Sequence, residues 1–475
     1  MQAVAPDPLG ARLREARAYF ERDQVAQAEA LLRGLCADSP AREDVATLLA
    51  EVLRSQGRFG AASEAMFALA VAAGFDAGIA LHAAAFAREC DRHAVAASIC
   101  EGALARGVAT AELLVLAGHV ARESGDFGSA RRHYLDALAA GIDLDRQNVL
   151  GALANTKRYS VASDPDRARC EAYFSNTTHA RSGRAAAGYA LAKILGDLGE
   201  YARAAAVLRE ANDMARALRP WDAASWQHFV EARLRERVAD AGAPGADFMP
   251  VFVTGVPRSG TTLTATLLAR ATDARDRGEL RTLRFIAERL RGGHLASPTV
   301  VAEAAGLYAK MARQDDAPAR WYVDQDPLNF RWLDIAAAMF PQARVIHLRR
   351  DPRDTALSLW SQEFAHPDMA FSSRFGDIAA FMQGHDELMA HWKQTLRIPI
   401  HQVDYETLVT EPEAVTAGLA AFIGAPLVPE RVDGSAPVTS ASVWQARQPV
   451  HTDSLGRWRH YAPYLPALAR FPAAD

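Results

Sequence analysis

The sequence predicts two domains of different fold class: an all-α solenoid of paired helices, followed by an α/β domain built on a parallel sheet. Four observations support this prediction. Small residues recur every 34 positions in the first half, and short apolar runs alternate with helical stretches in the second. All eight tryptophans lie after residue 220. A chain of 475 residues is also too long for one ordinary hydrophobic core.

Two columns of small residues keep the 34-residue step, and a bulky column keeps step with them. The columns are Ala28, Ala62, Ala96 and Ala130; Ala16, Ala50, Ala84 and Gly118; and Val25, Phe59, His93 and Phe127. This period is typical of tetratricopeptide repeats (TPRs), in which small residues let paired helices approach closely. We therefore expect a TPR-like helical domain over residues 1–218 and a linker over 219–249. Its groove would bind a peptide, an acceptor or a subunit, or the repeats would serve as a platform or a dimerisation arm.

Composition narrows the class of protein further. A formal net charge of −4 gives no general affinity for nucleic acid or membrane surfaces. The four cysteines have no Cys-x-x-Cys spacing, which is typical of free thiols in a reducing compartment. The first residues have no signal-peptide pattern, and no apolar run is long enough to span a bilayer. We expect a cytoplasmic protein without a membrane span.

The second domain opens with an apolar strand that runs into a glycine-bracketed loop, within residues 251–262. The loop keeps the Gly-x-x-x-x-Gly frame whose backbone amides and following helix N-terminus wrap a phosphate. It lacks the lysine of nucleotide hydrolases and carries Arg258 instead, which argues against an ordinary kinase or NTPase. The candidate anion-binding residues are Pro257, Arg258, Ser259, Gly260, Thr261 and Thr262.

Further strands and helices alternate after this loop, which predicts a doubly wound parallel sheet. We expect strands over 251–255, 321–324, 344–348 and 398–403, and helices from about 261, over 329–340 and from 352. Arg350 stands at the end of the third of these strands, and Ser358 lies two turns into the helix that follows. These two side chains can converge on a second phosphate.

The segments Gly-Val-Pro-Arg-Ser-Gly-Thr-Thr262 and Arg349-Arg-Asp-Pro-Arg-Asp-Thr-Ala-Leu-Ser358 resemble the 5′-phosphosulfate loop and the 3′-phosphate motif of sulfotransferases. The resemblance covers residues 250–475 and is greatest to bacterial TPR-linked members and to tyrosylprotein sulfotransferases. It implies 3′-phosphoadenosine-5′-phosphosulfate (PAPS) as donor, 3′-phosphoadenosine-5′-phosphate (PAP) as product and no metal. It also implies nucleotide contacts from Tyr405, Ser442 and Arg457.

The same resemblance implies a catalytic carboxylate at Glu279, with Asp273 and Asp276 open as alternatives. Arg258 would stabilise the charge that develops during transfer. The chain departs from the family pattern at Gln325, where relatives commonly carry a lysine that supports the leaving group. Asn329 either orients the same loop or simply caps a helix.

The sequence thus predicts a PAPS-dependent sulfotransferase that acts on an acceptor hydroxyl. A protein tyrosine, a carbohydrate and a small molecule all remain open as acceptors, and Arg281 and Arg284 favour an acidic one. The sequence also leaves open whether the chain forms a homodimer. The alternative is a catalytically weak or inactive nucleotide-binding TPR scaffold, which Gln325 favours.

Overall fold

The computed structural model of the chain describes residues 8–236, 247–290, 297–429 and 450–472. The chain divides into two compact units. Unit 1 comprises residues 1–142 together with 310–318, and unit 2 comprises 143–309 together with 319–475. Among the described residues, no helix combines the length and the apolar character that crossing a bilayer requires.

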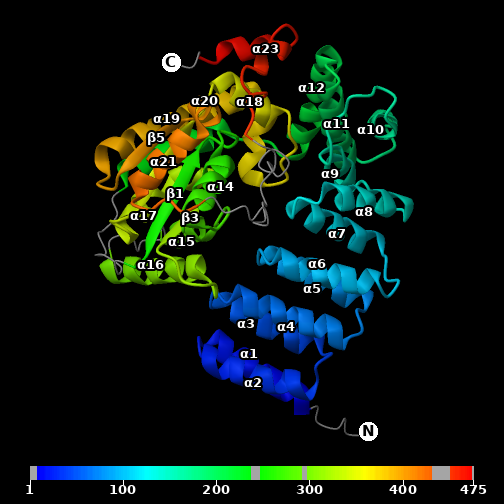
Figure 1. Ribbon diagram of the computed structural model, residues 1–475, viewed down its shortest axis with the longest axis vertical. Coiled ribbons are helices and arrows are strands. Elements are labelled where there is room, and N and C mark those ends of the chain that lie inside the picture. Colours follow the sequence, from blue (N-terminus) through cyan, green and yellow to red (C-terminus); the bar gives the residue numbers. More distant parts are fainter. Residues whose placement is uncertain (1–7, 237–246, 291–296, 430–449, 473–475) are drawn as a thin grey trace. The chain divides into compact units, whose positions relative to one another are not determined.

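Unit 1 is a series of helical hairpins (Figure 1). Its helices are α1 (Pro8–Glu21), α2 (Val25–Asp38), α3 (Glu43–Ser55), α4 (Phe59–Ala72), α5 (Ala77–Glu89), α6 (His93–Leu104), α7 (Ala111–Glu123) and α8 (Phe127–Ala139). Helices α2, α4, α6 and α8 begin 34 residues apart, so the predicted period is present in the helices themselves. Their assignment to the TPR class stays a prediction.

The small-residue columns lie where the helices of unit 1 touch. Ala28, Ala62 and Ala96 are fully buried. A Cβ atom added at Gly118 on α7 would collide with the ring of Tyr134 on α8, which is also fully buried. The repeat therefore preserves close helix approach, as interiors packed to crystal-like density require.

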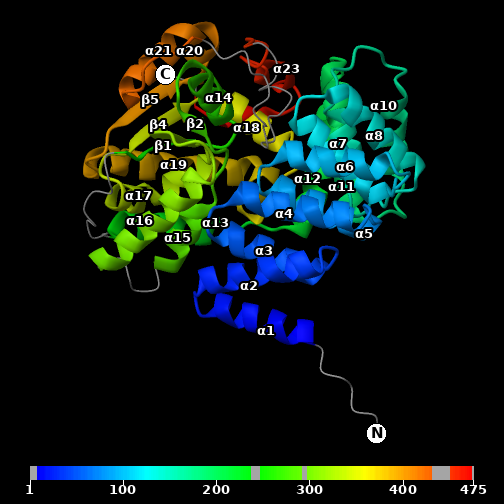
Figure 2. The same ribbon diagram turned by 60° about the horizontal axis from the view of Figure 1, so that its bottom comes forward.

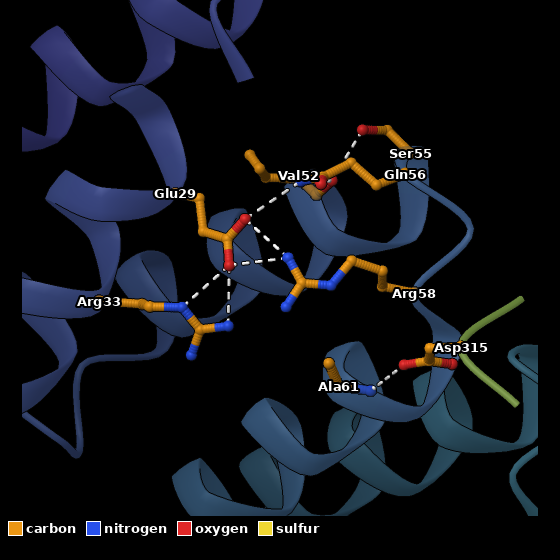
Figure 3. A network of polar contacts seen from close by, with 8 residues as sticks. All are labelled: Glu29, Arg33, Val52, Ser55, Gln56, Arg58, Ala61 and Asp315. Atoms are coloured by element: carbon orange, nitrogen blue, oxygen red, sulfur yellow. Dashed lines mark hydrogen bonds and ion pairs between the residues drawn. The ribbon is translucent and has the colours of Figure 1, made fainter. Parts of the chain in front are cut away.

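Polar contacts join successive hairpins of unit 1 (Figure 3). The Glu29 carboxylate on α2 accepts hydrogen bonds from Arg33 at 2.8 Å and from Arg58, which precedes α4, at 2.8 Å. The carboxylate of Asp315 accepts from the backbone N–H of Ala61 at 2.8 Å. A side chain from residues 310–318 thus caps the first turn of α4, where backbone donors lack helical partners.

Unit 2 begins with further helices: α9 (Val149–Ala154), α10 (Pro165–Ser175), α11 (Arg181–Asp197), α12 (Tyr201–Leu218) and α13 (Ala223–Arg235). Helix α13 lies inside the range 219–249, which the sequence suggested as a linker. Its Trp226 is buried and donates a hydrogen bond to the carbonyl of Ala380 at 3.1 Å. This stretch packs against the α/β part of the unit because a buried tryptophan anchors it.

The predicted parallel sheet is confirmed. Its strands are β1 (Met249–Gly255), β2 (Arg275–Asp276), β3 (Trp321–Asp324), β4 (Arg344–Arg349) and β5 (Ile400–Asp404). Their order is β2-β3-β1-β4-β5, and every pairing is parallel. Figure 2 labels β1, β2, β4 and β5 of this sheet. The carboxyl ends of β1 and β4 meet where Gly255 pairs with Leu348.

Helices cover both faces of the sheet. Val251 and Val253 of β1 join an apolar cluster with α14 and α21, whereas Phe252 between them contacts Tyr308 on the opposite face. This alternation follows from the two-residue period of a strand. The remaining elements are α14 (Thr261–Ala271), α15 (Thr282–Leu290), α16 (Pro298–Arg313), η1 (Pro327–Trp332), α17 (Leu333–Met339), α18 (Pro352–Trp360), η2 (Pro367–Ser373), α19 (Phe375–Thr395), α20 (Tyr405–Thr410), α21 (Pro412–Ile423), α23 (Trp458–Tyr461) and η3 (Pro466–Arg470).

The helix expected over 329–340 differs from the observed structure at its start. A 3₁₀ turn, η1, comes first, and the α-helix α17 begins only at Leu333. The hydroxyl of Thr254 on β1 donates to the carbonyl of Pro327 at 2.7 Å and accepts from the N–H of Phe330 at 2.9 Å. This side chain holds the tighter turn against the sheet, an effect that no local pattern in the sequence indicates.

We predict that Gly118→Ala loosens the α7–α8 hairpin by about 1–3 kcal/mol, because the added methyl overpacks the contact with Tyr134. Hydrogen exchange of the α7 and α8 amides measures this loss of protection. Gly34→Ala on α2 is the matched control, because its new methyl meets only ordinary van der Waals contact. Unchanged protection in the Gly118 variant would contradict the packing argument.

Candidate active site

The loop between β1 and α14 is pressed between two other segments of unit 2. A Cβ atom at Gly255 would lie 2.6 Å from the carbonyl oxygen of Leu348 on β4. One at Gly260 would lie 2.5 Å from the Tyr405 ring, and Gly260 has φ +108°. Both glycines of the frame are therefore required by space, and the second also by backbone conformation. Arg258 in the same loop has φ +77°, a conformation that residues with side chains seldom adopt.

A cavity of about 280 Å³ opens beside this loop, at the carboxyl ends of the strands, where parallel sheets bind ligands. Eleven of the residues selected from the sequence line it: Pro257, Arg258, Gly260, Thr261, Thr262, Glu279, Arg281, Arg284, Asn329, Arg350 and Tyr405. The fold thus brings together segments that lie as far apart as residues 257 and 405 in the chain.

Two arginines meet at one end of the cavity. Arg350 donates a hydrogen bond to the backbone carbonyl of Arg258 at 3.1 Å and lies over the ring of Tyr405, 4.4 Å from its centre. The Arg258 Nε–H donates to the Ser358 hydroxyl at 3.2 Å. Burial, and then the charge of Arg350, lower the pKa of Arg258 to about 10. Arg258 is therefore still charged at neutral pH. With the Arg350 guanidinium beside it, this end of the cavity favours an anion.

A late segment of the chain, residues 454–458, is tied to the same end. Arg350 donates to the Ser454 carbonyl at 2.9 Å, and the Ser454 hydroxyl lies 2.9 Å from that of Tyr405. Asp354 on α18 accepts from two backbone amides of the segment, at 2.6 and 2.8 Å. This segment therefore closes the arginine end of the cavity.

The other residues chosen from the sequence lie beside the cavity or elsewhere. Ser358 contacts Arg258 directly, whereas Ser259 and Gln325 are buried behind the wall. The Ser259 hydroxyl and the Gln325 side-chain carbonyl have no hydrogen-bond partner among the described residues. Arg457 lies over the ring of Tyr461, 5.8 Å from its centre, and does not line the cavity. Ser442 lies outside the described residues.

Glu279 stands on a short loop that follows β2. The backbone of Gln325 donates to the Gly278 carbonyl at 2.9 Å, which fastens the loop to the end of β3. The Glu279 side chain is exposed to water in the cavity, while the protein around it partly desolvates the carboxyl. This desolvation, followed by the negative charge of Asp326, raises the pKa of Glu279 to about 7. A ligand that displaced the water would deepen the desolvation.

Asp324, at the end of β3, holds the Glu279 loop from within. Its carboxyl is fully buried and accepts hydrogen bonds from the Leu280 N–H at 3.2 Å and the Tyr308 hydroxyl at 2.8 Å. Burial, and then the charge of Asp326, raise the pKa of Asp324 to about 8. This buried carboxyl therefore fixes the backbone next to Glu279 at a substantial electrostatic cost.

The lining of the cavity also contains a second charged cluster, which sequence reasoning found only in part. Asp368 on η2 forms an ion pair with Arg284 and lies 3.8 Å from Arg331 and 3.4 Å from His366. Arg284 was singled out from the sequence, but the other three were not. No motif marks them, because η2 joins the site only through the fold. Asp326, Trp332, Phe364 and Met369 also line the cavity.

Within the described part of the chain, no group of three or more histidine, cysteine, aspartate or glutamate side chains is arranged to hold a metal ion. The polar groups of the cavity are chiefly arginines, carboxyls and backbone amides.

Parts of the chain are similar to known proteins. Residues 250–430 match the model of the sulfotransferase family, and so form a sulfotransferase-family domain. Two similar relatives are protein-tyrosine sulfotransferase 1 of Danio rerio, 26% identical over 47% of this chain and 72% of that protein, and the protein-tyrosine sulfotransferase of Drosophila melanogaster, 24% identical over 37% of this chain and 38% of that protein.

A further relative is an uncharacterized protein of Aquifex aeolicus, 30% identical over 59% of this chain and 40% of its own length. The alignment thus spans less than half of that protein. Two solved sulfotransferase domains also match, one from the Synechococcus PCC 7002 olefin synthase and one from the curacin biosynthetic pathway. They are 21% and 16% identical, cover 46% and 49% of this chain and 83% and 99% of theirs, and have TM-scores of 0.29 and 0.25.

The buried carboxyl of Asp324 predicts a pH effect on stability. Between its ordinary pKa near 4 and its raised pKa of about 8, the folded chain holds a proton that the unfolded chain has lost. This group therefore lowers the free energy of unfolding as the pH rises through that window. We predict that Asp324→Asn gains stability relative to the parent chain between pH 5 and pH 8, measured by urea unfolding. Asp213→Asn, at an exposed position, is the control. An equal pH dependence in parent and variant would show that Asp324 is not buried in this way.

Proposed function

We propose that the chain transfers a sulfuryl group from PAPS to an acceptor hydroxyl. The observation that carries the proposal is the convergence on one cavity of a lysine-free phosphate loop, the Arg258–Arg350 pair and the Glu279 carboxyl with its raised pKa. The sulfotransferase-family match over residues 250–430 supports the reaction class.

The arginine end of the cavity suits a donor that carries two separate anionic groups. The backbone amides of the loop, with Thr261 and Thr262 in the first turn of α14, would bind the 5′-phosphosulfate. Arg350 and Ser358 would bind the 3′-phosphate, with Tyr405 against the nucleotide. Arg457 lies in the segment that closes this end and would approach the 3′-phosphate from there, as Ser442 would from its own segment.

In the proposed step, Glu279 accepts the proton of the acceptor hydroxyl while the acceptor oxygen forms a new bond to sulfur. The bond from sulfur to the phosphate oxygen breaks, and PAP leaves with the electron pair. A carboxyl with a pKa of about 7 is half ionised at neutral pH and is basic enough to take that proton. Arg258 would neutralise the charge that builds on the transferring group.

Gln325 supports a second candidate function. Its amide is uncharged, so it would support the leaving group less than a lysine would. A chain that binds the donor nucleotide without transferring the sulfuryl group, as a scaffold, would tolerate this residue. In the enzyme that we propose, Arg258 and the first turn of α14 stabilise the leaving group instead.

One donor, PAPS, is proposed, but several classes of acceptor remain possible. The relatives named protein-tyrosine sulfotransferase favour a phenolic hydroxyl, and a carbohydrate or small-molecule hydroxyl remains open. The acceptor would occupy the end of the cavity near Arg284 and Asp368. We propose that the helical repeats of unit 1 bind the acceptor or a second copy of the chain. The free cysteines suit a reducing cytoplasm.

The proposal predicts that the full chain moves radiolabelled sulfate from PAPS to a tyrosine-containing peptide or to 4-nitrophenol. Glu279→Gln should lower kcat by about 10²- to 10⁴-fold, the usual contribution of a general base. Stabilisation of the variant by PAP should match that of the parent chain, which would show that the donor site is intact. Loss of PAP binding in the variant, or near-normal turnover, would remove Glu279 from the role of base. A parent chain that binds PAP but transfers nothing would favour the scaffold.

The pH dependence of the rate gives a separate test. The base must be ionised, and below its pKa the ionised fraction falls tenfold per pH unit. We therefore expect kcat/KM to rise tenfold per unit up to about pH 7 and then to level off, because the pKa of Glu279 is about 7. An acid limb near pH 4.5 would mean that the reacting base is an ordinary solvated carboxyl.

A further inference from the structure

One wall of the cavity is an irregular segment between α18 and η2, residues 361–366. Phe364 and His366 line the cavity. Glu363 and Ala365 contact helices of the N-terminal part of unit 2 instead. The stretch 363–365 has no helical or strand hydrogen bonding of its own, so its position depends on contacts from outside.

Three polar side chains that precede the sheet in the chain supply those contacts. Asn148, the N-cap of α9, donates a hydrogen bond to the Glu363 carboxylate. Arg219, just after α12, donates to the Ala365 carbonyl at 3.2 Å. Asn212 on α12 donates to the carbonyl of Trp360 at 2.9 Å, at the end of α18. These hydrogen bonds hold the wall at Glu363 and Ala365, and they hold the end of α18 just before it at Trp360.

The contact from Asn212 is rigidly built. Its side chain is 2% exposed, donates also to the Leu208 carbonyl at 2.9 Å, and accepts from the Tyr189 hydroxyl at 2.8 Å. A buried amide with its partners in place fixes its neighbours, because breaking any of these bonds would strand a polar group in the interior. Helices α11 and α12 therefore present a fixed donor to the wall.

We propose that Asn148, Asn212 and Arg219 are positioning residues for the acceptor, because they set the wall formed by Phe364 and His366. This inference rests on the proposed function, which places the acceptor at that end. It gives the helices α9–α12 a part in the chemistry of the sulfotransferase site: they shape where the acceptor hydroxyl lies relative to the candidate base.

Displacement of the wall should weaken binding of the acceptor and leave binding of the donor unchanged. His366 lies 3.4 Å from Asp368, in the charged cluster that Asp368 forms with Arg284 and Arg331. The arginine end is organised separately, since Arg350 bonds to the backbone of Arg258 and Ser454. A displaced wall should therefore raise KM for the acceptor and leave donor binding unchanged.

The sharpest variant is Asn148→Asp. The Asn148 side-chain oxygen also accepts from the Gly151 N–H at 2.8 Å, and aspartate keeps this helix cap. The variant loses only the donor to Glu363 and places a like charge beside it. Adding Glu363→Gln restores an amide–carboxylate hydrogen bond with the two groups exchanged. Experiments are run at pH 8, because burial raises the pKa of Glu363 and a shared proton could bridge two carboxyls at lower pH.

We expect Asn148→Asp to raise KM for a tyrosine-containing peptide or 4-nitrophenol by tenfold or more, while stabilisation by PAP stays as in the parent chain. The double variant should recover most of the loss. Asn155→Ala is the matched control. Asn155 ends the same helix, and its side chain donates to the Gly151 carbonyl of that helix at 2.8 Å, its one side-chain hydrogen bond among the described residues. It should keep the parent KM.

Hydrogen exchange of residues 361–369 tests the wall without turnover. Exchange should be faster in Asn148→Asp and should return to the rate of the parent chain in the double variant. This result is expected even if the parent chain transfers no sulfuryl group, so a failure of the proposed function can be told from a failure of this inference. The inference is overturned if Asn148→Asp leaves both exchange and acceptor KM unchanged, or if it changes donor stabilisation as strongly as acceptor KM.

Discussion

The organisation of the candidate site depends on the close contact of the β1–α14 loop with its neighbours. There is no room for a side chain at Gly255 beside β4 or at Gly260 beside Tyr405. This contact brings the loop amides, the first turn of α14 and the end of β4 to one edge of the sheet, where the Arg258 carbonyl accepts a hydrogen bond from Arg350. Two cations that would otherwise repel each other are held together before any ligand arrives, which is the preorganisation that anion binding and charge stabilisation require.

The site thus contains one group of positively charged side chains and one group of carboxyls. The arginines form one group. Glu279 and Asp326 form the other, with the buried Asp324 beside them. Burial raises the pKa of all three carboxyls, and the charge of Asp326 raises the pKa values of Glu279 and Asp324 further. A doubly anionic donor would neutralise the first group and displace water from the second. Donor binding would therefore favour acceptor activation by electrostatics alone, without a large movement of the chain.

The sequence foretold those parts of the site whose signals are local. A strand, a glycine-framed loop and a helix follow one another within residues 249–271, and a strand end followed by a capped helix places Arg350 and Ser358 in the same way. The wall at His366 was not foreseen, because its position is set by Asn148 and other residues distant in the chain that carry no motif. The 3₁₀ turn η1 was not predicted for the same reason, because the hydroxyl of Thr254 on β1 stabilises it through a contact between distant parts of the chain. Helix α13 was missed because neighbouring alanine, glycine and proline suggested a linker, whereas the burial of its tryptophan is a tertiary effect.

If the proposed donor site is correct, the cavity selects a nucleotide phosphorylated at both its 3′ and 5′ ends. Thermal stabilisation by PAP, compared with stabilisation by ATP and by ADP, measures this selection. It needs no acceptor, and a ligand at 100 times its dissociation constant adds about 2.7 kcal/mol to the stability of the protein that binds it. We expect a rise in Tm with PAP that exceeds the rise with ATP or ADP and is lost in Arg350→Ala. No response to PAP, or a larger response to ATP, would contradict it.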